Sequence, residues 1–317
     1  MKKISILAIM ALFVIMSSCK GQTKEEFSTK TDNKKVEETA KKEDRHSKGD
    51  GLGFNPTEVQ VTKLSDNIYQ YFQFMYNSLI IITDEGVIVT DPASKERAAM
   101  MRNEIKRLTD KPVTKVIYSH DHYDHTRGGA IFKDEGAKFI SQEKAVELIS
   151  RDPYGEAIIP DITYKDNMTI NLDNGSTLDL LYYGPNDGDA MTIFHFPKEK
   201  ILFAVDFHLP RYVNEPYRLI AHNYGGILQT MKRIKRELDF DIVVSGHTPT
   251  SSPELFDEDL QFVEALYSAT LKGLKEGRTT EELMKEIKLP EFSHWRGYEE
   301  NLPGHIQRMS YTIWHGN

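Results

Sequence analysis

The sequence predicts a layered α/β domain, and three observations support this fold class. Short apolar segments typical of β-strands alternate with segments whose apolar residues recur at helical spacing. Turn-forming residues separate neighbouring strand-like segments, as Asp84, Glu85 and Gly86 do, which indicates β-hairpins. Of the 317 residues, 39% are apolar and 28% are charged, an ordinary globular composition that can bury one or two cores. Helices mixed with hairpins favour stacked layers over a helix bundle or an all-β sandwich.

The predicted strands and helices of the central region begin near Val59. The strand-like segments NIYQYF, SLIIIT and GVIVTD come first, and the helical pattern KERAAMMRNEIKRL separates them from a further strand, TKVIYS. The stretch LDNGSTL predicts a hairpin turn, and MTIFHFPKEKILFAVD predicts two buried strands. A helix, GGILQTMKRIKREL, and a last strand, DIVVSGH, complete the layered domain, which we place at residues 57–253.

The C-terminal region predicts a helical extension at residues 254–317 that packs on the domain. SPELFDEDLQFVEALYSATLKGLKEG has helical spacing and starts at a capping serine. TTEELMKEIKL starts with the capping-box pair Thr279 and Glu282. The final stretch contains both tryptophans, and we expect it to be a packing tail because large aromatic side chains are commonly buried; a lid that contacts the substrate is the alternative.

The first 19 residues predict export. Lys2 and Lys3 precede an apolar stretch that is too short to span a bilayer and has the form of a signal peptide. It ends in MSSCK, which resembles the lipobox of bacterial lipoproteins and makes Cys19 the expected lipidation site. We therefore expect an envelope protein, lipid-anchored and facing the periplasm. The alternative is a plain signal peptide with a chance cysteine and a secreted soluble product.

Residues 20–56 predict a flexible charged linker, because charges of both signs alternate there and large apolar residues are almost absent. Cys19 is the only cysteine, so the rest of the chain has no disulfide and no thiolate ligand. A formal net charge of -8 disfavours a nucleic-acid partner and fits a small-molecule substrate. The sequence leaves the oligomeric state open.

Potential metal ligands follow three of the buried-type strands. KVIYSH ends in His120, ILFAVD in Asp206 and DIVVSGH in His247. Loops that leave strand ends commonly carry functional sites in layered α/β sheets. If these strands share one sheet, the three side chains can converge on a single cleft.

The stretch SHDHYDHTRGG at residues 119–129 carries the densest group of ligand-type residues. In an extended segment, His120, His122 and Asp124 would face one point, while His125 would turn toward a neighbouring one. Two adjacent metal positions follow from that geometry. Imidazole and carboxylate ligands without thiolate suit Zn²⁺, with Fe or Mn as possible substitutes.

The motif HDHYDH matches the HxHxDH signature of the metallo-β-lactamase superfamily. The resemblance runs from about Glu58 to Thr250 and includes the Gly-Pro pair, LFAVD and SGH in the family's order. It implies an αββα sandwich with a two-metal cleft at one edge. Carried over residue by residue, it assigns His120 and His122 to the first metal, Asp124, His125 and His247 to the second, and Asp206 to a bridge between them.

One position departs from this pattern. The family's third histidine for the first metal follows the Gly-Pro pair, and a gap-free alignment places Asp187 there. Asp187 could supply an oxygen ligand, Asn186 or Asp189 could do so after a small loop shift, or the first site could be weak and leave one metal at the second. The expected cofactor is therefore one or two Zn²⁺ per chain, with Fe or Mn as alternatives.

The resemblance implies hydrolysis of a small ester, lactone, thioester or amide, β-lactams included, by a metal-bound hydroxide that Asp124 orients. Two alternatives are a mono-iron oxidoreductase of the same fold, similar to the sulfur dioxygenases, and a catalytically silent metal-binding lipoprotein. The residues expected near the substrate are Tyr76, His208, Tyr212 and Asn223. For His208, a structural role is an equally open alternative.

Overall fold

Two β-sheets carry the fold in the computed structural model, which describes residues 58–316. The predicted export signal, Cys19 and the whole of the charged linker lie outside the described residues. The larger sheet has the strand order β1-β2-β3-β4-β5-β6-β7. Its strands are β1 (Val59–Lys63), β2 (Ile68–Gln73), β3 (Tyr76–Thr83), β4 (Gly86–Thr90), β5 (Val113–Ile117), β6 (Lys138–Gln142) and β7 (Ile162–Tyr164).

The smaller sheet has the order β12-β11-β10-β9-β8. Its strands are β8 (Asn167–Asn171), β9 (Thr177–Tyr182), β10 (Thr192–Phe196), β11 (Ile201–Ala204) and β12 (Ile242–Ser245). Strands β1 to β4 and β8 to β11 pair antiparallel, as the hairpin signals predict. The pairs β4-β5, β5-β6, β6-β7 and β11-β12 are parallel.

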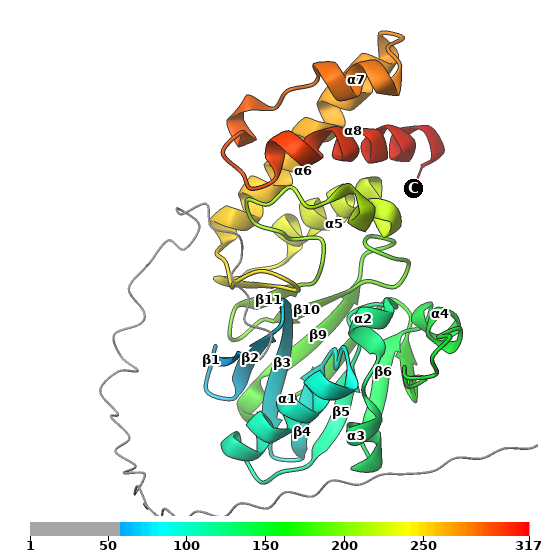
Figure 1. The fold of residues 1–317 in the computed structure, drawn as a ribbon. Helices are drawn as coiled ribbons and strands as arrows, with labels where there is room; N and C mark the ends of the chain where they lie inside the picture. The colour runs from blue at the N-terminus through cyan, green and yellow to red at the C-terminus, as the bar shows by residue number, and fades with distance from the viewer. Residues whose placement is uncertain (1–57, 317) are drawn as a thin grey trace, which may run out of the picture. The chain divides into compact units, whose positions relative to one another are not determined.

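Helices cover the outer faces of the two sheets (Figure 1). They are α1 (Lys95–Leu108), α2 (Tyr123–Thr126), α3 (Ala130–Asp134), α4 (Ala145–Ser150), α5 (Tyr224–Glu237), α6 (Pro253–Lys275), α7 (Thr280–Glu286) and α8 (Tyr298–His315). Short 3-10 helices occupy η1 (Asp173–Gly175), η2 (Pro216–Ala221) and η3 (Pro290–Phe292). In Figure 1, α1 and α3 lie over the larger sheet, while α5 to α8 gather at the opposite end.

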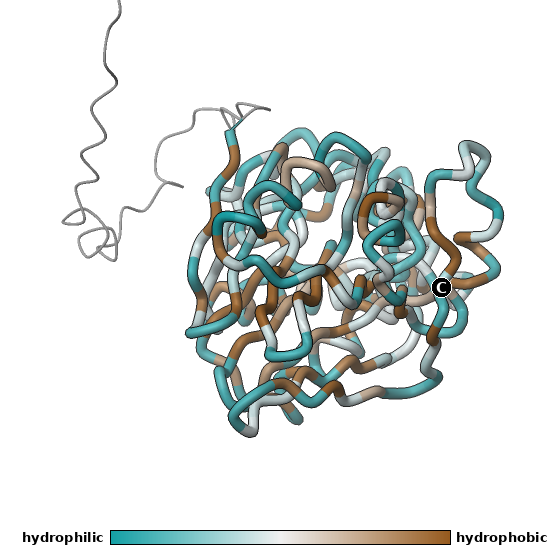
Figure 2. Tube along the Cα trace, turned by 90° about the horizontal axis from the view of Figure 1, so that it is seen from below, coloured by the Kyte–Doolittle hydropathy of each residue, from teal (hydrophilic) through white to brown (hydrophobic). Residues whose placement is uncertain are grey.

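Alternate residues of one strand supply two different cores. Ile80 on β3 belongs to the apolar cluster that also contains Met101 of α1, whereas its neighbour Ile81 belongs to the cluster that contains Phe194 of β10. Successive strand residues point to opposite faces, so the larger sheet packs on helices with one face and on the smaller sheet with the other. In Figure 2, apolar segments lie toward the interior of residues 58–316 and polar segments lie at the periphery. The predicted αββα sandwich is confirmed.

Helix α1 illustrates why local sequence predicted its bounds. Ser94 caps it by accepting a hydrogen bond from the Arg97 amide, and Glu96 lies in the first turn, where the helix dipole favours an acid. Lys106 and Arg107 lie in the last turn, where the dipole favours bases. The helix therefore begins and ends where the helical pattern does.

The C-terminal helices pack beside α5 within the same compact unit as the sheets. Both hydrogen bonds of the capping box between Thr279 and Glu282 are present, as predicted. Ser252 is the N-cap residue of α6, but its side chain makes no capping hydrogen bond. The expected packing tail contains a helix, α8, and only one tryptophan packs: Trp295 is 4% exposed and Trp314 72% exposed. No helix within residues 58–316 combines the length and apolar character needed to cross a membrane.

Candidate metal centre

Three strand ends deliver the central ligands, as the sequence predicts, although from two sheets rather than one. His120 follows β5 of the larger sheet, while Asp206 follows β11 and His247 follows β12 of the smaller sheet. Strands β11 and β12 are parallel, so their carboxyl ends lie at one edge. The three side chains meet, because Asp206 lies at ion-pair distance from both His120 and His247.

The conformation of the histidine-rich motif differs from the extended segment expected for it. The chain is extended only to His122, which is the N-cap residue of the short helix α2. Asp124 and His125 therefore lie in a helical turn, where the amide of His125 donates to the carbonyl of His122. The expectation that Asp124 shares a point with His120 and His122 is wrong, because the turn directs Asp124 toward His247 instead.

Two groups of ligand-type side chains result. The first group consists of His120, His122, Asp187 and Asp206, with one potential ligand atom of each within 4.8 Å of all the others. The second group consists of Asp124, His125 and His247, whose ligand atoms meet the same distance limit. These are the seven residues that the sequence proposed as metal ligands.

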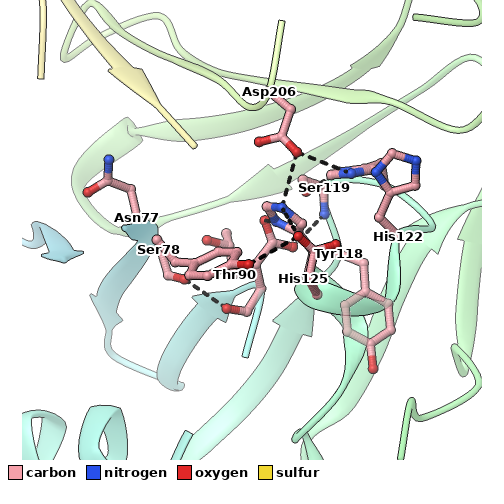
Figure 3. A network of polar contacts seen from close by, with 12 residues as sticks. Asn77, Ser78, Thr90, Tyr118, Ser119, His122, His125 and Asp206 are labelled. Carbon is pink, nitrogen blue, oxygen red and sulfur yellow. Dashed lines mark hydrogen bonds and ion pairs between the residues drawn. The ribbon is translucent and has the colours of Figure 1, made fainter. Parts of the chain in front are cut away.

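Asp206 lies between the two groups. Its Oδ2 is 3.5 Å from His120 Nε2 and 3.1 Å from His125 Nε2, and its Oδ1 is 3.0 Å from His247 Nε2. Figure 3 shows Asp206 above His125. The backbone of Asp206 has a φ of 62°, which is uncommon for a residue with a side chain. Gly246 allows this approach, since a Cβ there would lie 2.3 Å from Asp206 Oδ1. A carboxylate placed in this way can bind two ions at once.

In three of the histidines, a neighbouring polar group contacts the ring nitrogen Nδ1. His120 Nδ1 lies 2.8 Å from the hydroxyl of Ser119, and His125 Nδ1 lies 3.3 Å from Asp91 Oδ2. His247 Nδ1 donates to the Met75 carbonyl at 2.9 Å. Contacts of this kind fix the ring orientation and the tautomer, and they leave Nε2 to bind a metal.

Buried polar atoms without hydrogen bonds support a metal at this place. Among the described residues, they include His120 Nε2, His125 Nε2, Asp187 Oδ1 and Asp206 Oδ1. Several of them lie at ion-pair distance from an opposite group, but without hydrogen-bond geometry. Leaving such atoms unsatisfied is costly, and their nitrogen and oxygen chemistry suits a divalent cation. The residues present therefore fit a metal cofactor.

The charges at the centre act on one another strongly. Burial lowers the pKa of His120 well below its usual range, so this imidazole is neutral at pH 7. Burial also disfavours charge on His125 and His247, but the carboxylate of Asp206 outweighs it and raises the pKa of both. In return, these imidazoles hold the pKa of the buried Asp206 carboxyl well below its usual value.

Of the three residues proposed to replace the missing histidine, the structure places Asp187 in the first group. Asn186 is fully buried in the preceding position, and the Asp189 carbonyl accepts a hydrogen bond from Tyr182. His222 Nε2 lies 3.5 Å from Asp187 Oδ2, and the carbonyl of Ala221 accepts from the Gly188 amide. The loop that carries Asp187 therefore contacts the residues at the C-terminal end of η2.

A cleft of about 400 Å³ opens above the two groups, a size suited to a small molecule. It is lined by Met75, His122, Asp124, Asp187, Asp206, Leu209, Tyr212, Asn214, Glu215, Arg218, His222, His247 and Arg296. Helix α8 supports one wall, because Arg308 Nε donates to the His222 carbonyl and Asn301 Nδ2 donates to the Val213 carbonyl.

The four residues expected near the substrate divide into two pairs. Tyr212 lines the cleft, and the Tyr76 hydroxyl donates to Asp124 Oδ2 at 3.1 Å. His208 and Asn223 are corrections to the expected set. The buried His208 ring contacts Asp259 at 2.7 Å and Ser251 at 2.6 Å, so both nitrogens are used inside the protein. Asn223 caps α5 by accepting a hydrogen bond from the Gly226 amide.

Sequence reasoning missed several residues of the site. Asp91 ends the strand segment GVIVTD, so the strand-end pattern that identified His120 could have found it. Arg218, in the 3-10 helix η2, and Arg296 also line the cleft, but neither is part of a pattern with ligand spacing. Nothing in the sequence around them marks them as cleft residues.

Comparison with known proteins adds relatives by sequence. The alpha subunit of 2,4-dinitroanisole O-demethylase from Nocardioides sp. (strain JS1661) is 28% identical over 227 residues, which cover 70% of this chain and 65% of that one. A metallo-beta-lactamase type 2 from Elizabethkingia meningoseptica is 27% identical over 160 residues, 48% of this chain and 63% of that one. The chain thus spans just under two thirds of the length of these relatives, which are enzymes.

Solved structures show the same fold. A metallo-beta-lactamase from Pontibacter korlensis superposes with a TM-score of 0.58 at 19% identity and covers 65% of this chain and 99% of that one. The stereoselective inverting sec-alkylsulfatase from Pseudomonas sp. superposes with a TM-score of 0.68 at 17% identity, covering 81% of this chain and 50% of that one. The model of the metallo-beta-lactamase superfamily matches residues 72–247, and this chain belongs to that superfamily.

Proposed function

We propose that the protein is a metal-dependent, most simply zinc-dependent, hydrolase of a small molecule that carries an anionic group near an ester, lactone, thioester or amide bond. The observation that carries this proposal is the cluster of seven ligand-type side chains, five of which line a cleft whose wall contains two arginines. Superfamily membership supports an enzyme, and the cleft supports the substrate class.

His120, His122 and Asp187 would hold one ion, Asp124, His125 and His247 a second, and Asp206 would contact both. A divalent metal bound there would polarise the scissile bond and make a nucleophile available from water at neutral pH. No nucleophilic side chain is required for this chemistry.

Asp124 is the side chain best placed to move a proton. Half of its side chain is exposed, it lines the cleft, and its Oδ2 accepts a hydrogen bond from the Tyr76 hydroxyl at 3.1 Å. That hydrogen bond orients the carboxylate while its other oxygen remains available. Asp124 can therefore accept a proton at its carboxylate and return it to the leaving group.

The charge of the cleft favours an anionic substrate. Arg218 and Arg296 line it, and Glu215 pairs with Arg218 at 3.2 Å. The carboxylates at its floor would be neutralised by bound cations, and two guanidinium groups against the single carboxylate of Glu215 would leave the wall of the loaded cleft with positive charge. The same group of relatives includes a linear primary-alkylsulfatase from Pseudomonas sp. (strain ATCC 19151), whose name specifies a substrate with an anionic head.

The test compares paired substrates on the metal-loaded protein. Lactones, β-lactams and thioesters would be offered as anionic and neutral analogues with the same scissile bond, phosphate and sulfate monoesters would be added as substrates that are anionic in themselves, and metal content would be measured on the same sample. We expect turnover to favour the anionic member, and we expect Arg218→Gln to reduce that preference without changing metal content. Asp124→Asn should lower turnover of both members.

Two results would contradict the proposal. Equal turnover of neutral and anionic analogues would remove the anionic substrate class while leaving a hydrolase. Absence of turnover on the whole panel, together with about one tightly bound iron per chain, would instead favour the oxidoreductase chemistry known on the same fold.

We also propose that Cys19 anchors the protein to a membrane. The proposal is supported by the MSSCK sequence after an apolar stretch. Cys19→Ser should move the protein from the membrane fraction to the soluble fraction without altering its activity. Identical partitioning of variant and parent would rule out the lipid anchor.

A further inference from the structure

Arg97 is a buried cation whose hydrogen-bond partners are neutral. It lies in the first turn of α1 and is 3% exposed. Its guanidinium donates to the Ser78 hydroxyl at 2.9 Å, to the Asp91 carbonyl at 2.9 Å and to the Tyr76 carbonyl at 3.0 Å. Burying a charge is costly unless it is compensated, so an arginine at this position calls for an explanation beyond packing.

The two carbonyls belong to backbone segments in uncommon conformations. Tyr76 follows Phe74 and Met75, whose φ angles are 51° and 68°, and Asp91 itself has a φ of 40°. Left-handed conformations cost free energy for residues with a side chain, and they persist when the surroundings hold them. Arg97 is the group that bonds to both segments at once.

Each segment holds one histidine of the second group. The Met75 carbonyl accepts from His247 Nδ1 at 2.9 Å, one residue before the carbonyl that Arg97 binds. Asp91 Oδ2 lies 3.3 Å from His125 Nδ1, and the Asp91 carbonyl binds Arg97. The Arg97 guanidinium therefore binds the backbone of Asp91, which anchors His125, and the backbone next to Met75, which anchors His247.

We propose that Arg97 is a positioning residue of the metal centre, which sets the orientation of His125 and His247 by fixing the backbone that anchors them. The proposal rests on the metal site proposed above. A guanidinium suits the task because its planar fork can bond to two carbonyls and a hydroxyl in fixed directions, whereas an ammonium group cannot reproduce that geometry.

Arg102 provides a matched control within the same helix. It is 8% exposed, but it pairs with the carboxylate of Glu135 rather than with the backbone around the metal centre. A substitution at Arg102 thus perturbs a buried arginine of α1 without touching either histidine anchor. If substitution of Arg97 lowers metal affinity more than substitution of Arg102 does, the difference reflects the proposed positioning role rather than general damage to α1.

The experiment compares Arg97→Lys with Arg102→Lys in the full chain. Zn²⁺ affinity would be measured by competition with a chelator, the absorption spectrum would be recorded with Co²⁺ in place of Zn²⁺, and stability would be measured by urea unfolding of the metal-free protein. For Arg97→Lys we expect the affinity of the ion held by His125 and His247 to fall by about 10- to 100-fold, the range found when groups that orient metal ligands are removed. The Co²⁺ spectrum should also change, while Arg102→Lys should keep parental affinity and spectrum.

Parental Zn²⁺ affinity and Co²⁺ spectrum in a folded Arg97→Lys variant would overturn the inference, as would equal losses of affinity in both variants. If Arg97→Lys does not fold, Ser78→Ala carries the test, because Ser78 bridges the guanidinium and the Asp91 carbonyl. It should lower the affinity by about fivefold, the equivalent of one hydrogen bond, and an unchanged affinity would overturn the inference. A parent protein that binds no metal would contradict the proposed function instead.

Discussion

The two ligand groups differ in how firmly the rest of the protein holds them. In the second group, the Nδ1 atoms of His125 and His247 are held by Asp91 and by the Met75 carbonyl. In the first group, the partly buried His122 ring packs edge-on against His120, and within the described residues no hydrogen bond fixes its nitrogens. Asp187 lies on a loop between Gly184 and Gly188, both with positive φ. Ligands held in advance lose less freedom when a metal binds.

This difference between the two groups implies an order in which they bind metal ions. A ligand that is already oriented costs little conformational entropy on binding, whereas a loop carboxylate must be ordered at that moment. Asp124 is the exception in the second group, because half of its side chain is exposed. Even so, two anchored imidazoles and the shared Asp206 carboxylate favour the second group, so we expect the first equivalent of metal to bind there.

The largest expected effect is that of replacing a histidine of the second group, compared with replacing a histidine of the first group in a separate variant. His247→Ala should lower the affinity of the tighter ion by more than about 100-fold, because it removes a ligand and also its anchor to Met75. His122→Ala should leave that ion in place and lower only the affinity of the weaker one. Equilibrium dialysis with elemental analysis measures both. Equal losses from the two substitutions would show that the groups do not differ.

Asp91→Asn tests the anchor rather than the ligand. The amide keeps the shape of the side chain but loses the charge that stabilises a donating His125 Nδ1, so the affinity of the tighter ion should fall by about 10- to 100-fold. The weaker ion should be affected less. Chelator competition resolves the two constants, and urea unfolding of the metal-free variant controls for general damage.

The pH dependence of metal binding should also distinguish the groups. Metal must displace protons, and Asp206 raises the pKa of His125 and His247, whereas burial lowers that of His120. The affinity of the second group should therefore rise with pH, by up to about tenfold per unit for each proton displaced. Calorimetry in two buffers of different ionisation enthalpy counts these protons.

The same raised pKa values fix the sign of the stability change in the metal-free protein. The ion pairs of His125 and His247 with Asp206 contribute fully below the pKa of an unfolded histidine, and this contribution is lost as the pH rises through the raised folded values. Proton release that is equal for the two metal equivalents would contradict the assignment of the tighter ion to the second group.

The smallest expected effect concerns the departure at Asp187. Asp187→His should raise the affinity of the weaker ion by about tenfold, or about 1.4 kcal/mol, because an imidazole is a better ligand for zinc than a carboxylate on a glycine-flanked loop. Asp187→Ala should lower it. Two equivalents of equal affinity, insensitive to Asp187→Ala, would show that another residue completes the first group.

The fold was predictable because its signals are local. Strand and helix patterns span a few residues each, and the spacing within residues 120–125 is visible directly in the sequence. The anchors were not predictable, because Asp91 is 34 residues from His125 and a backbone carbonyl such as that of Met75 leaves no trace in residue identity. The same reason explains why His208 looked like a cleft residue: its distant partner Asp259 lies in α6.

The helical turn at α2 shows how local geometry can mislead as well. Alternation along an extended strand predicts that Asp124 joins His120 and His122, but the chain turns at His122 and the period changes from two to that of a helix. The family resemblance assigned Asp124 to the second group, whereas the residue spacing alone placed it with His120 and His122.

Helix α8 lies outside the segment that the superfamily model matches, yet Arg308 and Asn301 hold the carbonyls of His222 and Val213 in the cleft wall. The metal ligands all come from the matched segment. The metal ligands and most of the cleft wall therefore come from the matched segment, while Arg296 and the support from α8 come from the C-terminal part of the chain. Substitutions in α8 can therefore shift the cleft wall at His222 without replacing a metal ligand, so the shape of the cleft can change while the centre stays the same.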